Sequence, residues 1–97
     1  MTYQLRMYTV KDGAMEEWLR EWDAGVLPAR RAHGFSVLGP WVNRPERRFV
    51  WIVGHEGDFE TADKAYYDSP ERAALQPPPT RHLDEVVTLM LEPTGAP

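Results

Sequence analysis

The chain has 97 residues and a net charge of −4, which predicts a single domain over residues 1–97 and argues against a nucleic-acid partner. It has no cysteine, so disulfides, thiolate chemistry and cysteine-based zinc sites are excluded. No apolar run approaches the roughly 20 residues that span a bilayer, and the amino terminus begins with strand-like residues rather than a signal peptide. We therefore expect a cytoplasmic protein with no membrane partner.

The first half of the chain predicts a strand, a helix and a hairpin. Tyr3–Val10 is rich in β-forming residues that alternate between two faces. From about Ala14 to His33, apolar residues recur at helical spacing, although Gly25 and Pro28 predict a kink or a break. The third and fourth segments, Phe35–Asn43 and Arg47–His55, are joined by a short loop and predict an antiparallel hairpin. Gly39 and Pro40 favour an edge position or a bulge for the first of these strands.

The second half predicts a helix and a final strand. Asp58 is a good N-cap for a helix from Phe59 to about Asp68, and Ser69-Pro70 restarts a short helix. Leu83–Leu91 reads as the last strand. The order strand, helix, strand, strand, helix, strand is the ferredoxin-like β-α-β-β-α-β motif. This motif is an α+β fold with a four-stranded antiparallel sheet and both helices on one face.

The two helices can cover only one face of such a sheet. We expect Leu5, Met7, Val50 and Ile52 to pack beneath the helices. The other face would then carry two sets of side chains: Gln4, Arg6, Tyr8 and Val10 from the first strand, and Phe49, Trp51, Val53 and His55 from the third. Trp41 would join this uncovered face, which would be strongly aromatic. A large exposed apolar patch usually marks an interface or a ligand site. The pattern therefore predicts a homodimer that encloses a cavity, or simple packing of both tryptophans at the interface.

Three groups of residues resemble the NIPSNAP family of the dimeric α/β-barrel superfamily. The first is Tyr3–Gly13, and the second is Val26-Leu27-Pro28 leading to His33-Gly34-Phe35. The third is Asn43-Arg44-Pro45, Arg48–Ile52, Gly54 and Tyr66–Pro70. The resemblance covers nearly the whole chain and implies a dimer whose two sheets form a barrel. Related members include cofactor-independent monooxygenases, isomerases and cyclases, and some degrade haem. Val53 and His55 depart from the bacterial pattern, which has an arginine and an aromatic residue there.

The candidate catalytic residues are His55, Tyr8 and Arg6. A histidine at a pocket mouth titrates near the range of acid–base catalysis. Arg6 and Tyr8 point the same way and could hold a carboxylate or a developing oxyanion. The alternatives are that His55 is a hydrogen-bonded rim residue, and that Arg6 pairs with an acid such as Glu85 or Glu92. Four residues are expected to wall the substrate pocket: Trp51, Trp41, Phe49 and Val53.

These residues lead to three hypotheses about function. The first is a cofactor-independent enzyme, of isomerase, cyclase or monooxygenase type, that acts on a small apolar cyclic or aromatic substrate in the barrel cavity. The second is a non-catalytic module that binds a small ligand or another protein. The third is a haem site with His55 or His82 as the axial ligand. We expect no metal and no cofactor, because there is no His-Glu-x-x-His pattern and no Gly-rich phosphate loop. The sequence also has no nucleophile elbow, which removes the usual hydrolase signal.

Overall fold

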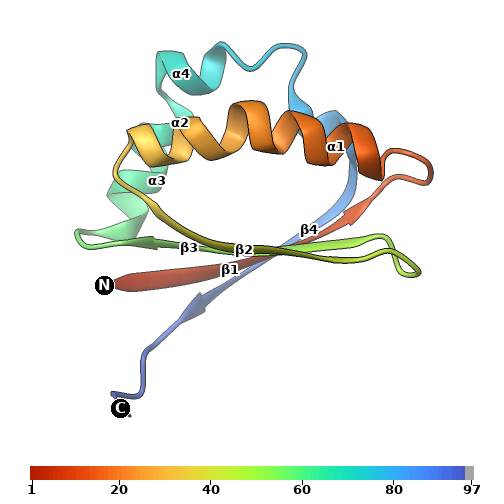
Figure 1. The fold of residues 1–97 in the computed structure, drawn as a ribbon. Coiled ribbons are helices and arrows are strands. Elements are labelled where there is room, and N and C mark those ends of the chain that lie inside the picture. The colour runs from red at the N-terminus through yellow and green to blue at the C-terminus, as the bar shows by residue number, and fades with distance from the viewer. Residues whose placement is uncertain (96–97) are drawn as a thin grey trace.

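The structure, a computed structural model, describes residues 1–95. Within this range a four-stranded antiparallel sheet has the strand order β2-β3-β1-β4, so β1 and β3 are central. The helices all lie on one face of the sheet (Figure 1). The predicted ferredoxin-like α+β architecture is confirmed. The strands are β1 (Thr2–Val10), β2 (Ser36–Asn43), β3 (Arg48–His55) and β4 (Leu83–Leu91).

The first helical segment is a single coil with a π-helical turn in its middle. α1 (Met15–Glu21) leads into the turn η1 (Trp22–Val26), which leads into α2 (Leu27–Ala32). The Leu27 N–H bonds to the carbonyl of Trp22, five residues earlier, which defines the wider turn. The predicted interruption near Gly25 and Pro28 is this turn. The helix axis continues through it, and the wider turn lies directly before Pro28, which has no N–H to donate to the preceding turn.

The second helical segment starts and restarts where the caps predict. The Asp58 carboxylate accepts from the N–H of Thr61 at 3.0 Å and caps α3 (Phe59–Tyr67). The Ser69 hydroxyl accepts from the N–H of Arg72 at 3.1 Å and caps α4 (Pro70–Ala73). A short 3₁₀ turn, η2 (Pro79–His82), then leads into β4. Among the described residues, no helix has the length and apolar character needed to cross a membrane.

The prediction of which sheet face meets the helices is wrong. The face carrying Arg6 and Tyr8 lies beneath the helices and is buried, as are Val10, Phe49, Trp51 and Val53. Trp22 of η1 lies edge-on to both Phe49 and Trp51, with ring centroids 5.3 Å apart in each case. The bulky rings fill the space between the helix layer and the sheet, and so they occupy the covered side. The opposite, uncovered face carries the four residues that were expected beneath the helices: Leu5, Met7, Val50 and Ile52.

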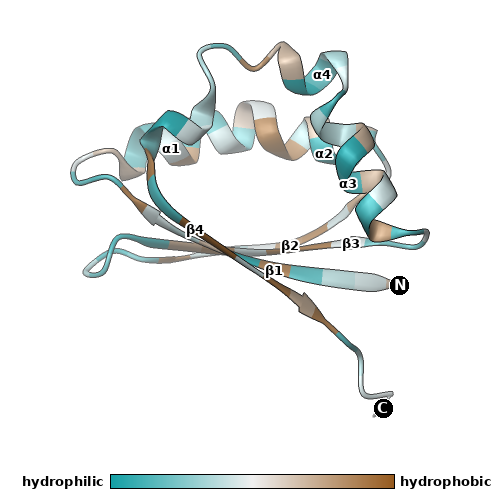
Figure 2. Ribbon diagram, turned by 180° about the vertical axis from the view of Figure 1, so that it is seen from behind, coloured by the Kyte–Doolittle hydropathy of each residue, from teal (hydrophilic) through white to brown (hydrophobic). Residues whose placement is uncertain are grey.

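The uncovered face of the sheet is nevertheless apolar, as predicted. Trp41 lies on this face and is 55% exposed, so its predicted position is correct. β4 contributes Leu89, which pairs with Leu5 and is also exposed. β2 is an edge strand with a register shift between Leu38 and Trp41, which confirms the bulge predicted around Gly39-Pro40. Apolar side chains therefore line both faces of the central strands, and Figure 2 shows the hydrophobic stretches of β3 and β4 from behind.

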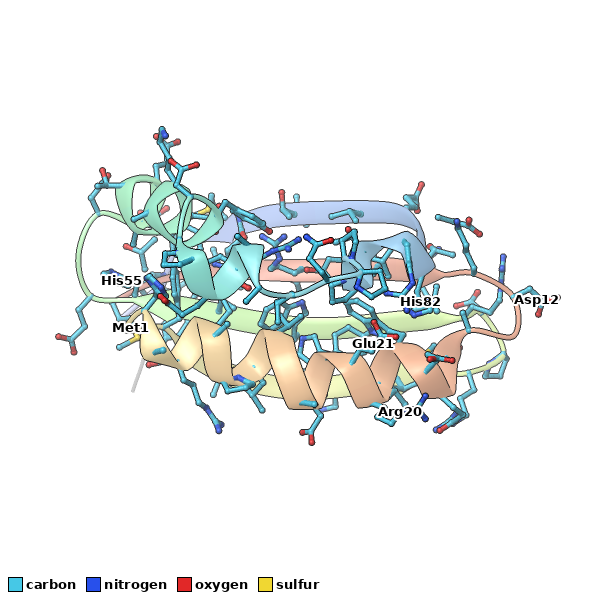
Figure 3. All side chains as sticks on the ribbon, turned by 90° about the horizontal axis from the view of Figure 1, so that it is seen from above. Met1, Asp12, Arg20, Glu21, His55 and His82 are labelled. Carbon is cyan, nitrogen blue, oxygen red and sulfur yellow. The ribbon has the colours of Figure 1, made fainter. Side chains whose placement is uncertain are left out.

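Glu21 at the end of α1 ties the segment before β4 to the helix layer. Both of its carboxylate oxygens accept from Arg81, at 2.8 and 2.7 Å, and Nε2 of His82 lies 2.9 Å from Oε2. Figure 3 shows Glu21 and His82 side by side above the sheet. His82 directly precedes β4 and has a carboxylate partner there.

The contacts of Glu21 with Arg81 and His82 predict that the stability of the fold decreases in acid. The hydrogen bond from Arg81 lowers the pKa of the Glu21 carboxyl, with a further contribution from His82. Because the folded-state pKa lies below the unfolded value, the interaction stabilises the protein above about pH 4.3 and is lost as the pH falls through the folded-state pKa. We expect Glu21→Gln to lower the melting temperature at pH 7, and the difference from the parent protein to shrink between about pH 5 and pH 3. Thermal melts across this range check it, with the exposed Glu17→Gln as control. A pH-independent difference would contradict the prediction.

Candidate functional site

Arg6 and Tyr8 of β1 form a buried polar pair beneath the helices. The two residues share a face of the strand, and Nε of Arg6 donates to the Tyr8 hydroxyl at 2.7 Å. Arg6 also donates from Nη1 to the Gln4 amide oxygen at 2.7 Å and from Nη2 to the Tyr67 hydroxyl at 2.9 Å. Arg6 is only 7% exposed. The structure therefore brings together two of the three predicted catalytic residues.

A second arginine, Arg30 of α2, lies beside this pair. It is 1% exposed, and its Nη1 donates to Asp63 of α3 at 2.7 Å while its Nη2 lies 3.3 Å from the same Tyr67 hydroxyl. Its guanidinium stacks over the ring of Tyr66, 4.0 Å from the centroid. We call Arg6, Tyr8, Arg30, Asp63 and Tyr67 the arginine–tyrosine cluster.

The electrostatics of the cluster keep Arg6 charged and Tyr8 neutral at pH 7. Burial raises the pKa of Tyr8, and the neighbouring Arg6 opposes the rise without cancelling it. Burial alone would lower the pKa of Arg6, but the Coulomb interactions with Tyr8 and Tyr67 raise it overall. The site thus presents a guanidinium and a phenol O–H, the donor types that stabilise a negatively charged oxygen.

Arg6 has no carboxylate partner in the described part of the chain. No Asp or Glu oxygen lies within 4.0 Å of its guanidinium. The predicted alternative, an ion pair with Glu85 or Glu92, is therefore wrong. Glu85 instead pairs with Thr9 across the strands, and its Oε1 lies 3.4 Å from the Thr9 hydroxyl. A buried charge held only by neutral groups is unusual, because desolvation of an ion is costly unless it is paired.

Further buried donors around the cluster lack acceptors. Within residues 1–95, the indole N–H of Trp51, Nε of Arg30 and the Tyr66 hydroxyl have no hydrogen-bond partner of acceptable geometry. The Trp51 N–H makes a small contribution that opposes the rise in the pKa of Tyr8. Most buried polar groups in proteins are hydrogen-bonded, so several buried polar groups without partners in one place call for an explanation.

The cluster meets the surface along β4, which the helices leave open. Seen from above, β4 runs along the side of the molecule away from α1 and α2 (Figure 3). Val86 pairs with Tyr8 and Met90 pairs with Gln4, so these side chains share the helix-side face with the cluster. We call Val86, Thr88 and Met90 the β4 strip, and all three are exposed. Tyr67 is 43% exposed and lies between the buried arginines and solvent.

His55, the predicted acid–base residue, lies apart from the cluster. It pairs with Thr2, whereas Arg6 pairs with Trp51, four residues along β3. At about 3.3 Å per residue, the separation along the strand is roughly 13 Å. His55 Nδ1 accepts from the N–H of Gly57 at 2.9 Å. Figure 3 shows His55 and His82 at opposite ends of the molecule.

The pocket beside His55 is an open one between α2 and α3. It has a volume of about 340 Å³ and is lined by His33, His55, Asp58, Thr61, Ala62 and Ala65. The haem hypothesis needs a free Nε2 on an axial histidine. In His82, Nε2 is in contact with the Glu21 carboxylate. In His55, the hydrogen bond is made by Nδ1, so Nε2 stays available.

The four predicted wall residues do not form one pocket. Trp51, Phe49 and Val53 are buried in the core beneath the helices, whereas Trp41 lies on the other face of the sheet. The prediction failed because both faces of β3 are apolar, so the two-residue period of the strand does not identify the covered side.

Sequence reasoning missed three members of the cluster. Arg30 lies in the last turn of α2, where a cation is commonly explained by the helix dipole, but it is buried and paired. Asp63 and Tyr67 lie on α3 at positions i and i+4, and so on one helix face. That spacing was a readable signal that a polar group faces the core. The partner of that group could not be read from the sequence.

Comparisons with known proteins place this fold in a family. The NIPSNAP family model matches residues 3–95. An uncharacterized NIPSNAP domain protein from Burkholderia xenovorans superposes with a TM-score of 0.85 at 17% identity, covering 100% of this chain and 99% of that chain. A NIPSNAP family protein from Agrobacterium tumefaciens has a TM-score of 0.85 at 17% identity, covering 97% and 86% of the two chains.

The fold also extends to proteins named for an enzymatic activity. A protein described as an antibiotic biosynthesis monooxygenase superposes with a TM-score of 0.72 at 14% identity, covering 96% of this chain and 98% of that chain. At such identities the likeness shows the fold alone. A comparison with curated proteins found no significant match.

Proposed function

The chain belongs to the NIPSNAP family, and from this premise we propose that it is a cofactor-independent enzyme acting on a small, largely apolar substrate at the arginine–tyrosine cluster. The observation that carries the proposal is the buried Arg6 guanidinium, which has only neutral partners and lies next to the exposed β4 strip. The fold shared with a protein named as a monooxygenase supports it.

The chemistry of the cluster suits reactions that pass through an enolate or phenolate. Isomerisation, cyclisation and oxygenation of an electron-rich ring all place negative charge on a substrate oxygen. In a low-dielectric site, a fixed guanidinium and a phenol O–H stabilise that charge more strongly than water does. Arg6 and Tyr8 would hold the oxygen, and Val86 and Met90 would contact the apolar body. His55 lies too far away to act on the same atom.

A turnover screen with paired variants tests the proposal. Enolisable cyclic ketones and electron-rich phenols would be screened for product formation and, separately, for oxygen uptake. For any substrate found, we expect Arg6→Gln and Tyr8→Phe each to lower kcat by about 10²-fold, the usual loss when one oxyanion donor is removed. Arg20→Gln and Tyr3→Phe serve as controls, because Arg20 is exposed on α1 and Tyr3 lies on the other face of β1. Unchanged turnover in both cluster variants would reject the assignment.

A non-catalytic binding role is the second candidate. The observation that favours it is the dense packing beneath the cluster, where Trp51 and Phe49 are 1% and 0% exposed. Binding of a small ligand without product formation or oxygen uptake, again lost in Arg6→Gln, would support this role over catalysis.

We also propose that the uncovered sheet face pairs with a second copy of the chain. The face is apolar across all four strands, including Leu5, Trp41, Ile52 and Leu89. A second copy presents the same apolar surface, so face-to-face pairing would bury both.

Two adjacent residues of β4 provide a matched test of this dimer. Leu89 and Met90 are 55% and 53% exposed but point to opposite faces of the sheet. We expect the protein to sediment as a dimer at micromolar concentration, Leu89→Lys to sediment as a monomer, and Met90→Lys to remain dimeric. A monomeric parent protein, or equal effects of the two variants, would contradict the pairing.

A further inference from the structure

We infer that the arginine–tyrosine cluster binds an organic monoanion whose charge is carried on oxygen, such as a small aromatic carboxylate. This inference rests on the site proposed above and specifies the class of its ligand. It starts from the charges inside the cluster. Arg6 and Arg30 each carry one positive charge, and Asp63 carries one negative charge. One positive charge is therefore left uncompensated, and a ligand with a single negative charge would balance it.

The hydrogen-bonding capacity of Arg6 supports the same ligand class. A guanidinium has five N–H donors, and three of those of Arg6 go to Gln4, Tyr8 and Tyr67. One donor on each of Nη1 and Nη2 remains. A carboxylate has two acceptor oxygens and binds arginine most strongly through two such contacts. The buried orphan donors nearby, on Trp51 and Arg30, show that the site is rich in donors and poor in acceptors.

Tyr67 occupies the position where a ligand would approach. Its hydroxyl oxygen accepts from Arg6 at 2.9 Å and from Arg30 at 3.3 Å, so its own O–H is free to donate elsewhere. A third guanidinium, that of Arg72, lies 5.6 Å from the centre of its ring. The positive groups around Tyr67 would attract an anion toward the open side of the cluster, next to the β4 strip.

Matched pairs of charged and neutral probes test the inference. The probes are 1-naphthoate with 1-naphthamide, and benzoate with benzamide, because each pair differs in charge but little in shape. Binding to the full chain would be measured by isothermal titration calorimetry and by the shift in melting temperature. We expect each carboxylate to bind roughly tenfold more tightly than its amide, and the preference to weaken as salt rises. Equal affinity within both pairs, or no binding of either carboxylate, would overturn the inference.

Variants locate the anion within the molecule. Arg6→Gln should abolish the preference for carboxylate, Arg6→Lys should retain part of it, and the exposed Arg20→Gln should leave it unchanged. Near-UV circular dichroism checks that each variant is folded, and the comparison of probes on the parent protein stands even if Arg6→Gln does not fold. A preference that survives in a folded Arg6→Gln variant would overturn the assignment to this cluster. Carboxylate binding without turnover in the screen above would remove the proposed enzymatic function and leave this inference standing.

Discussion

We expect Trp51→Ala to lower the free energy of unfolding by about 3–5 kcal/mol, the cost of truncating a large buried aromatic residue. Trp51 is 1% exposed, and its ring meets those of Trp22 and Tyr8 edge-on, with centroids 5.3 and 6.4 Å away. Alanine would leave a cavity between the helix layer and the sheet, where the packed neighbours cannot fully collapse. Urea unfolding followed by circular dichroism measures the change.

Trp41→Ala is the matched control for this experiment. Trp41 lies on the uncovered face and is 55% exposed, so truncation should change the stability of a single chain by roughly 0.5 kcal/mol or less. Both substitutions would be made in the Leu89→Lys background, so that dissociation of a dimer does not contribute. If the two substitutions lower the free energy of unfolding equally, the placement of Trp51 beneath the helices is wrong.

The second large effect is expected at Arg30. We expect Arg30→Ala to destabilise the protein by about 3 kcal/mol, because it removes a buried cation from its partner and opens a gap beside Tyr66. The value lies at the low end for a broken buried pair, since the Asp63 side chain is 25% exposed and regains water. Chemical unfolding at pH 7 measures it.

The neighbouring Arg31 and a double-mutant cycle make the Arg30 result specific. Arg31 is exposed on the same turn, so Arg31→Ala should have little effect on stability. Combining Arg30→Ala with Asp63→Ala should cost less than the sum of the two single changes, because each single change already breaks the pair. Strict additivity would show that the two side chains are not coupled.

The order and type of the elements could be predicted from local signals. The caps Asp58 and Ser69 marked the starts of α3 and α4, and Pro40 marked an irregular edge strand. These signals work because each depends on a few neighbouring residues: a side chain that satisfies an N–H, or a ring that removes one. The ferredoxin-like topology then follows from the order alone.

The covered face of the sheet could not be predicted in the same way. In β3 the residues on both faces are apolar, with Phe49 and Trp51 on one side and Val50 and Ile52 on the other. Alternation identifies which residues share a face but not which face the helices cover. The helix layer presents Trp18 of α1 and Trp22 of η1, whose rings pack against aromatic rings of the sheet. That complementarity depends on three-dimensional packing and was visible only in the structure.

The candidate site also has a part that could be predicted from sequence and a part that could not. Arg6 and Tyr8 were predicted together because they are two apart on one strand, and the structure joins them. Arg30 and Tyr67 come from α2 and α3, far apart in the chain, and meet only through the helix packing. His55 lies on the same face of the sheet as Arg6 and Tyr8, but at the end of β3. Spacing within one element is readable from sequence, whereas convergence of three elements is not.

The π-helical turn η1 is a place where the helix can change its length without changing its facing. A π-helical turn holds about one residue more than an α-helical turn, so deleting one residue from Trp22–Val26 would restore ordinary winding and leave the facing of α2 nearly unchanged. Arg30, which follows the turn, would still face Asp63 and Tyr67. A one-residue deletion between the turn and Arg30 has no such compensation. It would rotate Arg30 by about 100° about the helix axis, away from both partners.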